Sequence, residues 1–275
     1  MAAYIKLPEE DIISKYQQGL SLRYLSEIYN VDKSVIKNRL IKNGIVLRTL
    51  SEANRIYEVN EDIFSVIDSH TKAYWLGFIA SDGSIYRGSL KLGLSFKDYD
   101  HVYKFRNFMG SNHPIKEYTV ELNGKQYKSC ELRISSLKII NSLSKFGIIP
   151  NKSFNLIPAN IQSKYINSYI LGIIDGDGCF YVDKKNQIKL NVINSYEICQ
   201  FIVDSFVQNC GIKSTKIIKD NRSKIYYCYF GGNLKLKKIT DFLYKDVDCF
   251  LTRKFEIVKN HYRWYVNQPH NKLIS

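Results

Sequence analysis

The 275-residue chain has no long run of apolar residues, so it lacks the roughly 18-residue stretch that a membrane helix needs. Its first residues also contain no apolar core of the kind found in secretion signals. Among six cysteines there is no Cys-x-x-Cys pair, and the five histidines include no pair four residues apart, so we expect neither a zinc site nor a disulfide framework. We therefore expect a protein that is not secreted and not in a membrane, located in the cytoplasm, an organelle or a phage host.

Acidic side chains are too few to balance the basic ones, since 26 Asp and Glu stand against 40 Lys and Arg, for a net charge of +14. A positive excess of this size predicts a polyanionic partner. The 45% of hydrophobic residues excludes a disordered chain and is sufficient for compact cores. Because the chain is longer than one hydrophobic core usually serves, we expect two or three compact units.

Residues 1–58 are predicted to form a small all-α domain with a helix-turn-helix over residues 21–40. Asn30 suits the left-handed turn, and Asp32 suits the N-cap of the second helix. That helix would direct a polar set outward, as helices that enter the DNA major groove do: Lys33, Ser34, Lys37 and Asn38. A helical bundle with a solvated basic face is the alternative. Residues 44–49 resemble the basic arm that often follows such modules.

The rest of the chain contains one pattern twice. Residues 74–83 and 169–178 both read Tyr-x-Leu-Gly-x-Ile-x-x-Asp-Gly, and a match of this length at domain-sized spacing indicates an internal duplication. After each copy, alternating apolar residues predict two strands, a helix, a second hairpin and another helix. Each half, 59–158 and 159–275, therefore reads αββαββα. The predicted fold is α+β, with two antiparallel sheets that keep one polar face free.

Small residues four apart mark one face of each repeated helix, namely Gly77 with Ser81 and Gly172 with Gly176. Such a face allows two helix backbones to approach closely. The glycines that follow each motif, at 83 and 178, are expected to adopt the left-handed conformation of a helix C-cap.

Each repeated helix has an aspartate in its last turn, Asp82 and Asp177. The C-terminus of a helix carries partial negative charge and disfavours a carboxylate. If the small faces pack together, two carboxylates meet at two negative helix ends, where each resists ionising unless a cation lies between them. A hard divalent ion such as Mg²⁺ meets this need, and carboxylate-bound metal is the arrangement that hydrolyses a phosphodiester.

The two segments resemble the paired LAGLIDADG motifs of monomeric, double-motif homing endonucleases, over roughly residues 60–260. The resemblance implies that the motif helices form the interface between two pseudo-symmetric halves and that the sheets form a saddle over DNA, both strands of which are cut. It assigns metal binding to Asp82 and Asp177, with contributions from the carbonyls of Ser81 and Gly176. It also implies catalytic basic residues, which match Lys152 and Lys254. Asp175 is assigned no chemistry, because its counterpart is Ala80.

The polar strand faces are expected to contact DNA through long basic, amide and hydroxyl side chains: Lys91, Ser95, Arg133, Lys189 and Asn191. Together with the resemblance, these features predict a Mg²⁺-dependent, site-specific endonuclease of double-stranded DNA that acts as a monomer. The resemblance implies a role in intron or intein mobility, and an intron, an intein and a free-standing gene stay open as its context. A sequence-specific DNA-binding regulator that does not cut and an intron RNA maturase remain as alternatives. Residues 259–265 mix basic and aromatic side chains, which could lie on DNA or cover a core.

Overall fold

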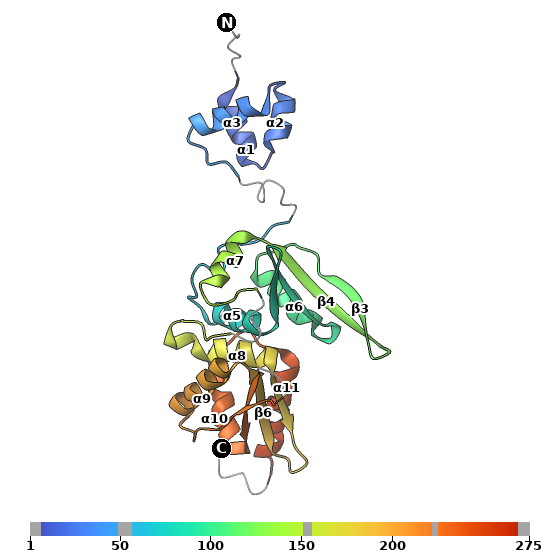
Figure 1. Ribbon diagram of the computed structural model, residues 1–275, viewed down its shortest axis with the longest axis vertical. Helices are drawn as coiled ribbons and strands as arrows, with labels where there is room; N and C mark the ends of the chain where they lie inside the picture. Colours follow the sequence, from blue (N-terminus) through green and yellow to red (C-terminus); the bar gives the residue numbers. More distant parts are fainter. Residues whose placement is uncertain (1–6, 49–56, 151–155, 222–224, 269–275) are drawn as a thin grey trace. The chain divides into compact units, whose positions relative to one another are not determined.

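The computed structural model describes residues 7–48, 57–150, 156–221 and 225–268. Contacts divide the chain into two units, Met1–Tyr57 and Glu58–Ser275 (Figure 1). None of the helices in these ranges is both long and apolar enough to span a bilayer.

The first unit contains α1 (Glu9–Gln17), α2 (Leu22–Ile28) and α3 (Lys33–Lys42) around a core that includes Leu25 and Ile36. Asn30 turns the chain between α2 and α3 with a φ of 48°, and the Asp32 side chain accepts a hydrogen bond from the Ser34 amide at 2.7 Å. Both features agree with the sequence analysis, because the turn needs a left-handed residue and α3 needs a capping oxygen.

The expectation of a basic arm is wrong for Arg48. Its guanidinium carbon lies 4.3 Å from the centre of the Tyr16 ring, and the guanidinium donates to the Gly19 carbonyl at 2.8 Å. Stacking and hydrogen bonding therefore hold Arg48 against its own domain.

Both halves of the second unit follow the predicted order αββαββα. The first half consists of α5 (His70–Asp82), β1 (Gly83–Tyr86), β2 (Ser89–Ser95), α6 (Tyr99–Phe108), β3 (Lys116–Leu122), β4 (Lys125–Ser135) and α7 (Leu137–Ser144). The second consists of α8 (Ile166–Asp177), β5 (Gly178–Val182), β6 (Ile188–Asn194), α9 (Tyr196–Cys210), β7 (Ile217–Lys219), β8 (Tyr226–Gly231) and α10 (Asn233–Leu243), followed by α11 (Thr252–Val266). Short 3₁₀ turns precede α6 and α8, at Phe96–Asp98 and Ser163–Tyr165. The predicted α+β fold is confirmed.

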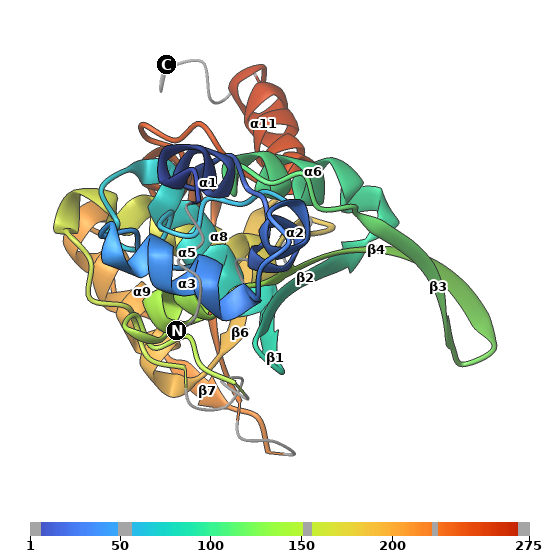
Figure 2. The ribbon, with the colours of Figure 1, turned by 90° about the horizontal axis from the view of Figure 1, so that it is seen from above.

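The two sheets are antiparallel and have the same strand order, β1-β2-β4-β3 and β5-β6-β8-β7. Alternate residues of the central strands are buried, such as Leu90 and Leu92 in β2 and Leu190 and Val192 in β6. Helices α6 and α7 pack on the first sheet, and α9 and α10 pack on the second. Figure 2 shows the β3–β4 hairpin projecting from the first sheet.

Helices α5 and α8 pack side by side where the two halves meet (Figure 1). All residues from 73 to 80 of α5 and from 167 to 175 of α8 are buried. A helix that is apolar on all sides is stable in water only where other elements cover each of its faces. The two halves consequently share one apolar core.

The helices touch through their backbones at Gly77 and Gly172. A Cβ placed on Gly77 would lie 2.1 Å from the Tyr169 carbonyl oxygen, and one on Gly172 would lie 2.1 Å from the Tyr74 carbonyl oxygen. Ser81 extends the contact, because its hydroxyl donates to the Ile173 carbonyl at 3.2 Å. The small residues are therefore required by the close approach of α5 and α8.

The expectation of left-handed glycine caps is wrong. Gly83 and Gly178 have φ values of −74° and −96° and lead directly into strands. A Cβ would lie 2.7 Å from the Ile79 carbonyl oxygen at the first position and 2.6 Å from the Ile174 carbonyl oxygen at the second. Crowding by the preceding helical turn therefore explains both glycines.

Replacing Gly172 by alanine should lower the free energy of unfolding of the second unit by about 3 kcal/mol, because the new methyl group meets the backbone of α5. Urea denaturation followed by tryptophan fluorescence measures this, since both tryptophans belong to the second unit. Gly93→Ala is the matched control, because the nearest atom there, on a lysine side chain, lies 3.5 Å away. Equal losses of stability in the two variants would contradict the close helix contact.

Candidate nuclease site

Asp82 and Asp177 are the last residues of α5 and α8, and each precedes the first strand of its half. A Cβ placed on Gly176 would lie 2.3 Å from the Ser81 Cβ and 3.4 Å from the carboxyl carbon of Asp82. The Asp82 carboxyl group therefore lies against the last turn of α8, next to the residue that precedes Asp177. Both aspartates are partly exposed. The helix contact thus brings one carboxylate from each half to the same end of the interface.

Asp177 is oriented by Asn194, the last residue of β6. The Asn194 amide nitrogen donates to Asp177 Oδ2 at 2.7 Å, and its own oxygen accepts from the Ser195 amide at 2.9 Å. Only 6% of Asn194 is exposed. The sequence analysis missed this residue, although the alternation in β6 places a polar side chain at an inward position after Val192, and a buried amide needs a partner.

Lys254 lies at the end of α8. It is 3% exposed, and its ammonium donates to the carbonyls of Ile174 at 2.8 Å, Asp175 at 2.7 Å and Gly178. The last carbonyls of a helix lack intrahelical partners, and the negative helix end attracts a cation. Lys254 therefore caps α8. Its acceptors do not include the Gly176 carbonyl, and its catalytic role stays a prediction.

Burial lowers the pKa of Lys254, and the charge of Asp175 opposes that shift. The negative charge of Asp82 also raises the pKa of Lys254. The ammonium group is therefore close enough to the candidate metal site to interact with it electrostatically. The neighbouring Arg253 points elsewhere, since its Nε lies 3.0 Å from a carboxylate oxygen of Asp98 in the first half.

Asp175 connects three helices. Its Oδ2 accepts from the Tyr74 hydroxyl of α5 at 2.8 Å and from the Leu251 amide, before α11, at 2.7 Å. Burial raises the pKa of Asp175 to about 6, while Lys254 acts in the opposite direction. The sequence analysis assigned this residue no chemistry, but an acid alone in an apolar helix signals a buried partner. Ala80 cannot make these contacts in the first half.

His101 of α6 completes this buried group. Its Nε2 lies 2.9 Å from the Tyr74 hydroxyl oxygen, and burial lowers the pKa of His101 to about 3. The histidine is therefore neutral at neutral pH. Because the Tyr74 proton is directed to Asp175, His101 donates from Nε2.

The donor set fits a hard divalent ion. The expected donors are the two carboxylates and the carbonyl oxygens of Ser81 and Gly176, all in the last turns of α5 and α8, and Mg²⁺ prefers oxygen ligands. Within the described ranges, no cluster of three or more His, Cys, Asp or Glu side chains could hold a metal. An ion here would take further oxygens from water or phosphate, as Mg²⁺ usually does. Lys152 lies outside the described residues.

The predicted DNA-contact residues of the sheets lie on the polar face, and the three cationic ones pair with acidic side chains of the protein. Lys91 and Arg133 face each other across β2 and β4, and both pair with Glu131, at 2.6 and 3.2 Å. Lys189 lies 3.4 Å from Asp183. The sequence analysis missed Glu131, which occupies the outward face beside these cations. Ser95 is exposed, and the side-chain oxygen of Asn191 has no hydrogen-bond partner among the described residues.

The predicted contact residues of the first unit share one exposed surface of α3, away from the buried Ile36 and Leu40: Lys33, Ser34, Lys37 and Asn38. All four side chains are accessible to a ligand.

Several solved structures are similar to this chain. The meganuclease I-SmaMI bound to uncleaveable DNA is 14% identical, covers 73% of this chain and 94% of its own, and gives a TM-score of 0.49. The homing endonuclease I-GzeII in complex with its DNA target is 12% identical, with 78% and 95% covered and a TM-score of 0.43. The N-terminal LAGLIDADG domain of DUF199/WhiA is 16% identical, with 78% and 98% covered and a TM-score of 0.43.

No protein-family model matches the sequence. At these identities the likeness to LAGLIDADG proteins concerns the fold alone. The αββαββα order of both halves and the strand order of both sheets agree with the fold expected from the two motif segments.

Asp175 and His101 should give the stability of the second unit opposite dependences on pH. Between about pH 4 and pH 6, native Asp175 binds a proton that the unfolded chain has released, so its contribution falls as pH rises. Over the same interval unfolded His101 binds a proton that the native state excludes, so its contribution rises with pH. In the unsubstituted protein, the two contributions to the pH dependence of the free energy of unfolding should largely cancel.

Asp175→Asn removes one of these contributions. The free energy of unfolding should then rise more steeply with pH, by up to about 1.4 kcal/mol per pH unit in this interval. Urea denaturation at several pH values measures the slope, with the exposed Asp248→Asn as the control. Parallel pH profiles for native and Asp175→Asn proteins would show that Asp175 is not the buried titrating group.

Proposed function

We propose that the chain is a site-specific, divalent-metal-dependent endonuclease of double-stranded DNA. The observation that supports this is the backbone contact of α5 and α8, which delivers Asp82 and Asp177 from opposite halves to one end of the interface. Two hard carboxylates at negative helix ends are costly unless a cation accompanies them. A protein that only bound DNA would not need this pair.

Asp82 and Asp177 would hold the metal, together with the carbonyls of Ser81 and Gly176. A divalent ion held there supplies Lewis acidity, which activates water and stabilises the leaving oxygen of a phosphodiester. The chain contributes rigidity around the site. Asn194 fixes one oxygen of Asp177, and Lys254 holds the last turn of α8 in place.

Double-stranded DNA is the substrate that best matches the architecture. Two sheets of identical strand order present polar faces, and the chain has a net charge of +14. A two-fold related protein surface matches a duplex, whose half-sites can follow the same symmetry. Because both halves belong to one chain, we propose that a monomer binds the site. Phosphates would then compete with Glu131 for Lys91 and Arg133.

Selection from a random duplex library by binding, followed by incubation with Mg²⁺, tests the nuclease proposal. Asp82→Asn and Asp177→Asn should each reduce cleavage at least about 100-fold, because each removes a charged metal ligand while leaving the fold intact. Duplex binding should persist in both variants. Asp204→Asn, an exposed residue of α9, is the matched control.

Undiminished cleavage by Asp82→Asn would contradict the proposed metal site. Tight, specific binding without cleavage by the native chain, unaffected by Mg²⁺ and by both substitutions, would favour the non-cleaving regulator instead.

The first unit is proposed to extend the DNA contact through α3. Lys33→Glu and Lys37→Glu should each weaken duplex binding about tenfold at low salt, and the salt dependence of the affinity should become less steep. Fluorescence anisotropy of a labelled duplex at several salt concentrations measures both effects. Lys42→Glu, at the last turn of the same helix, should change binding less. Equal effects at all three positions would argue against a recognition surface at the start of α3.

A further inference from the structure

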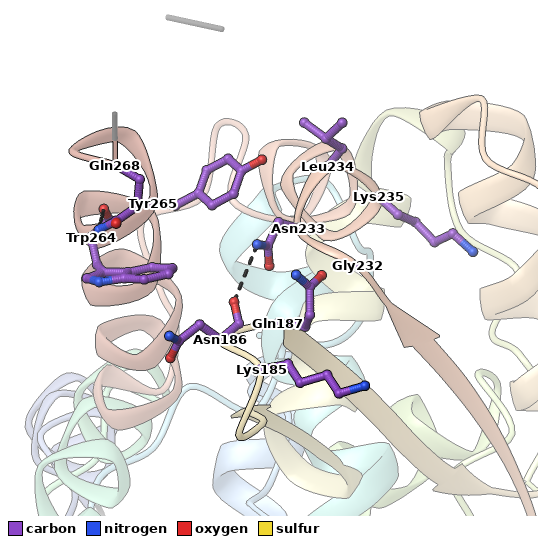
Figure 3. Close-up of a pocket in the computed structure, with 10 residues that line it drawn as sticks. All are labelled: Lys185, Asn186, Gln187, Gly232, Asn233, Leu234, Lys235, Trp264, Tyr265 and Gln268. Atoms are coloured by element: carbon purple, nitrogen blue, oxygen red, sulfur yellow. Dashed lines mark hydrogen bonds between the residues drawn. The ribbon is translucent and has the colours of Figure 1, made fainter. Parts of the chain in front are cut away.

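A cavity of about 610 Å³ lies in the second half, between the β5–β6 turn, the start of α10 and the end of α11 (Figure 3). Its volume is in the range of small-molecule sites. Helix α11 begins next to Leu251, which contacts Asp175, and the cavity lies at its other end, about 20 Å along the helix. The cavity is therefore separate from the candidate nuclease site.

One wall of the cavity is aromatic. Trp264 is 39% exposed, and Tyr265 projects from the same end of α11 (Figure 3). Buried His261 supports both rings, with ring centres 5.7 Å from Trp264 and 6.1 Å from Tyr265. The rings are consequently held in place by packing before any ligand binds.

The remaining lining is polar and basic. Lys185 and Asn186 come from the β5–β6 turn, Lys235 from the first turn of α10, and Gln268 from the residues after α11. None of the described residues that line the cavity carries a carboxylate. The cavity therefore combines ring faces, amide groups and positive charge.

Asn233 links the three elements that surround the cavity. Its side-chain oxygen accepts from the Ile188 amide at 3.0 Å and from His261 Nε2 at 3.1 Å. Its side-chain nitrogen donates to the Asn186 carbonyl at 3.4 Å, the dashed line in Figure 3. Only 8% of Asn233 is exposed. This network makes the cavity a preformed site, which reduces the entropy lost on binding.

The repeated fold does not dictate this lining. At the equivalent corner of the first half, two acids contact the start of α7: Ser136 donates to Glu61, and Lys138 pairs with Asp62 at 2.7 Å. The start of α7 therefore has acidic partners, whereas the described residues that line the cavity at the start of α10 include no acid. The duplicated architecture can form without the aromatic and basic cavity.

We propose that this cavity binds an unpaired nucleotide, with its base on Trp264 and its phosphate near Lys185 and Lys235. Aromatic side chains stack on unpaired bases, amide groups hydrogen-bond to base edges, and lysines attract the phosphate. Single-stranded RNA, single-stranded DNA and a free nucleotide share this chemistry. The proposal is independent of the nuclease site.

Tryptophan fluorescence of the full chain tests the proposal directly. Trp75 is 1% exposed in α5, so quenching by a stacked base reports on Trp264. The probes are an unstructured RNA and a DNA of the same sequence, each about 12 nucleotides long, and a nucleoside monophosphate. At least one probe should quench the fluorescence with saturable binding, and the probe that binds most tightly identifies the source of the nucleotide.

Trp264→Ala and Lys235→Glu should each weaken binding of that probe about tenfold. Fluorescence anisotropy of a labelled oligonucleotide measures the affinity directly, and competition against that oligonucleotide measures it for an unlabelled nucleotide. Trp264→Phe should retain most of the affinity, because a ring remains for stacking. Tyr103→Ala and Lys213→Glu make the same kinds of change at exposed residues outside the cavity and should leave binding unchanged.

Duplex binding and cleavage should be unaffected by Trp264→Ala, so failure of this proposal can be distinguished from failure of the nuclease proposal. The proposal is overturned if no probe quenches Trp264. It is also overturned if Trp264→Ala and Lys235→Glu bind the probes as tightly as the native chain.

Discussion

The backbone contact between α5 and α8 is the constraint on which the rest of the second unit depends. Gly77 and Gly172 leave no room for a Cβ, so each helix lies directly against the carbonyls of the other. This contact buries both helices, merges the cores of the two halves and directs two chain segments of opposite halves toward the same end of the interface. The placement of Asp82 beside the last turn of α8 is a direct result.

The fold is duplicated, and the second half shows how a set of buried side chains supports the helix that ends in Asp177. In the second half, Asn194 orients Asp177, Lys254 caps the end of α8, and Asp175 ties that helix to Tyr74 and to the start of α11. In the first half Ala80 occupies the position of Asp175. The two motif helices therefore differ at this position, although they occupy equivalent places in the two halves. The aromatic and basic cavity at the far end of α11 is a further feature of the second half.

Much of the fold could be predicted because its signals are local. The repeated motif located the central helices, and period-two alternation located the inner strands. The second hairpin expected in the first half is present, and its turn passes through Asn123 and Gly124, both with positive φ. The surroundings of the site depend on packing between distant segments, which no local pattern reveals. The contact of Lys254 with the end of α8 and the pairing of Lys91 in β2 with Glu131 in β4 are of this kind. The conformation of Gly83 and Gly178 was predicted wrongly. Steric crowding by the preceding helical turn, rather than a left-handed backbone conformation, requires glycine at both positions.

The central claim is that the close packing of α5 and α8 creates one metal site shared by both halves. Its most direct test is a crystal structure of the full chain with a bound duplex and Mn²⁺, in which anomalous scattering locates the ion. The account predicts an anomalous peak within coordination distance of carboxylate oxygens from both Asp82 and Asp177, next to a phosphate of the DNA. Carboxylates that face separate compartments, or manganese bound only elsewhere, would contradict it.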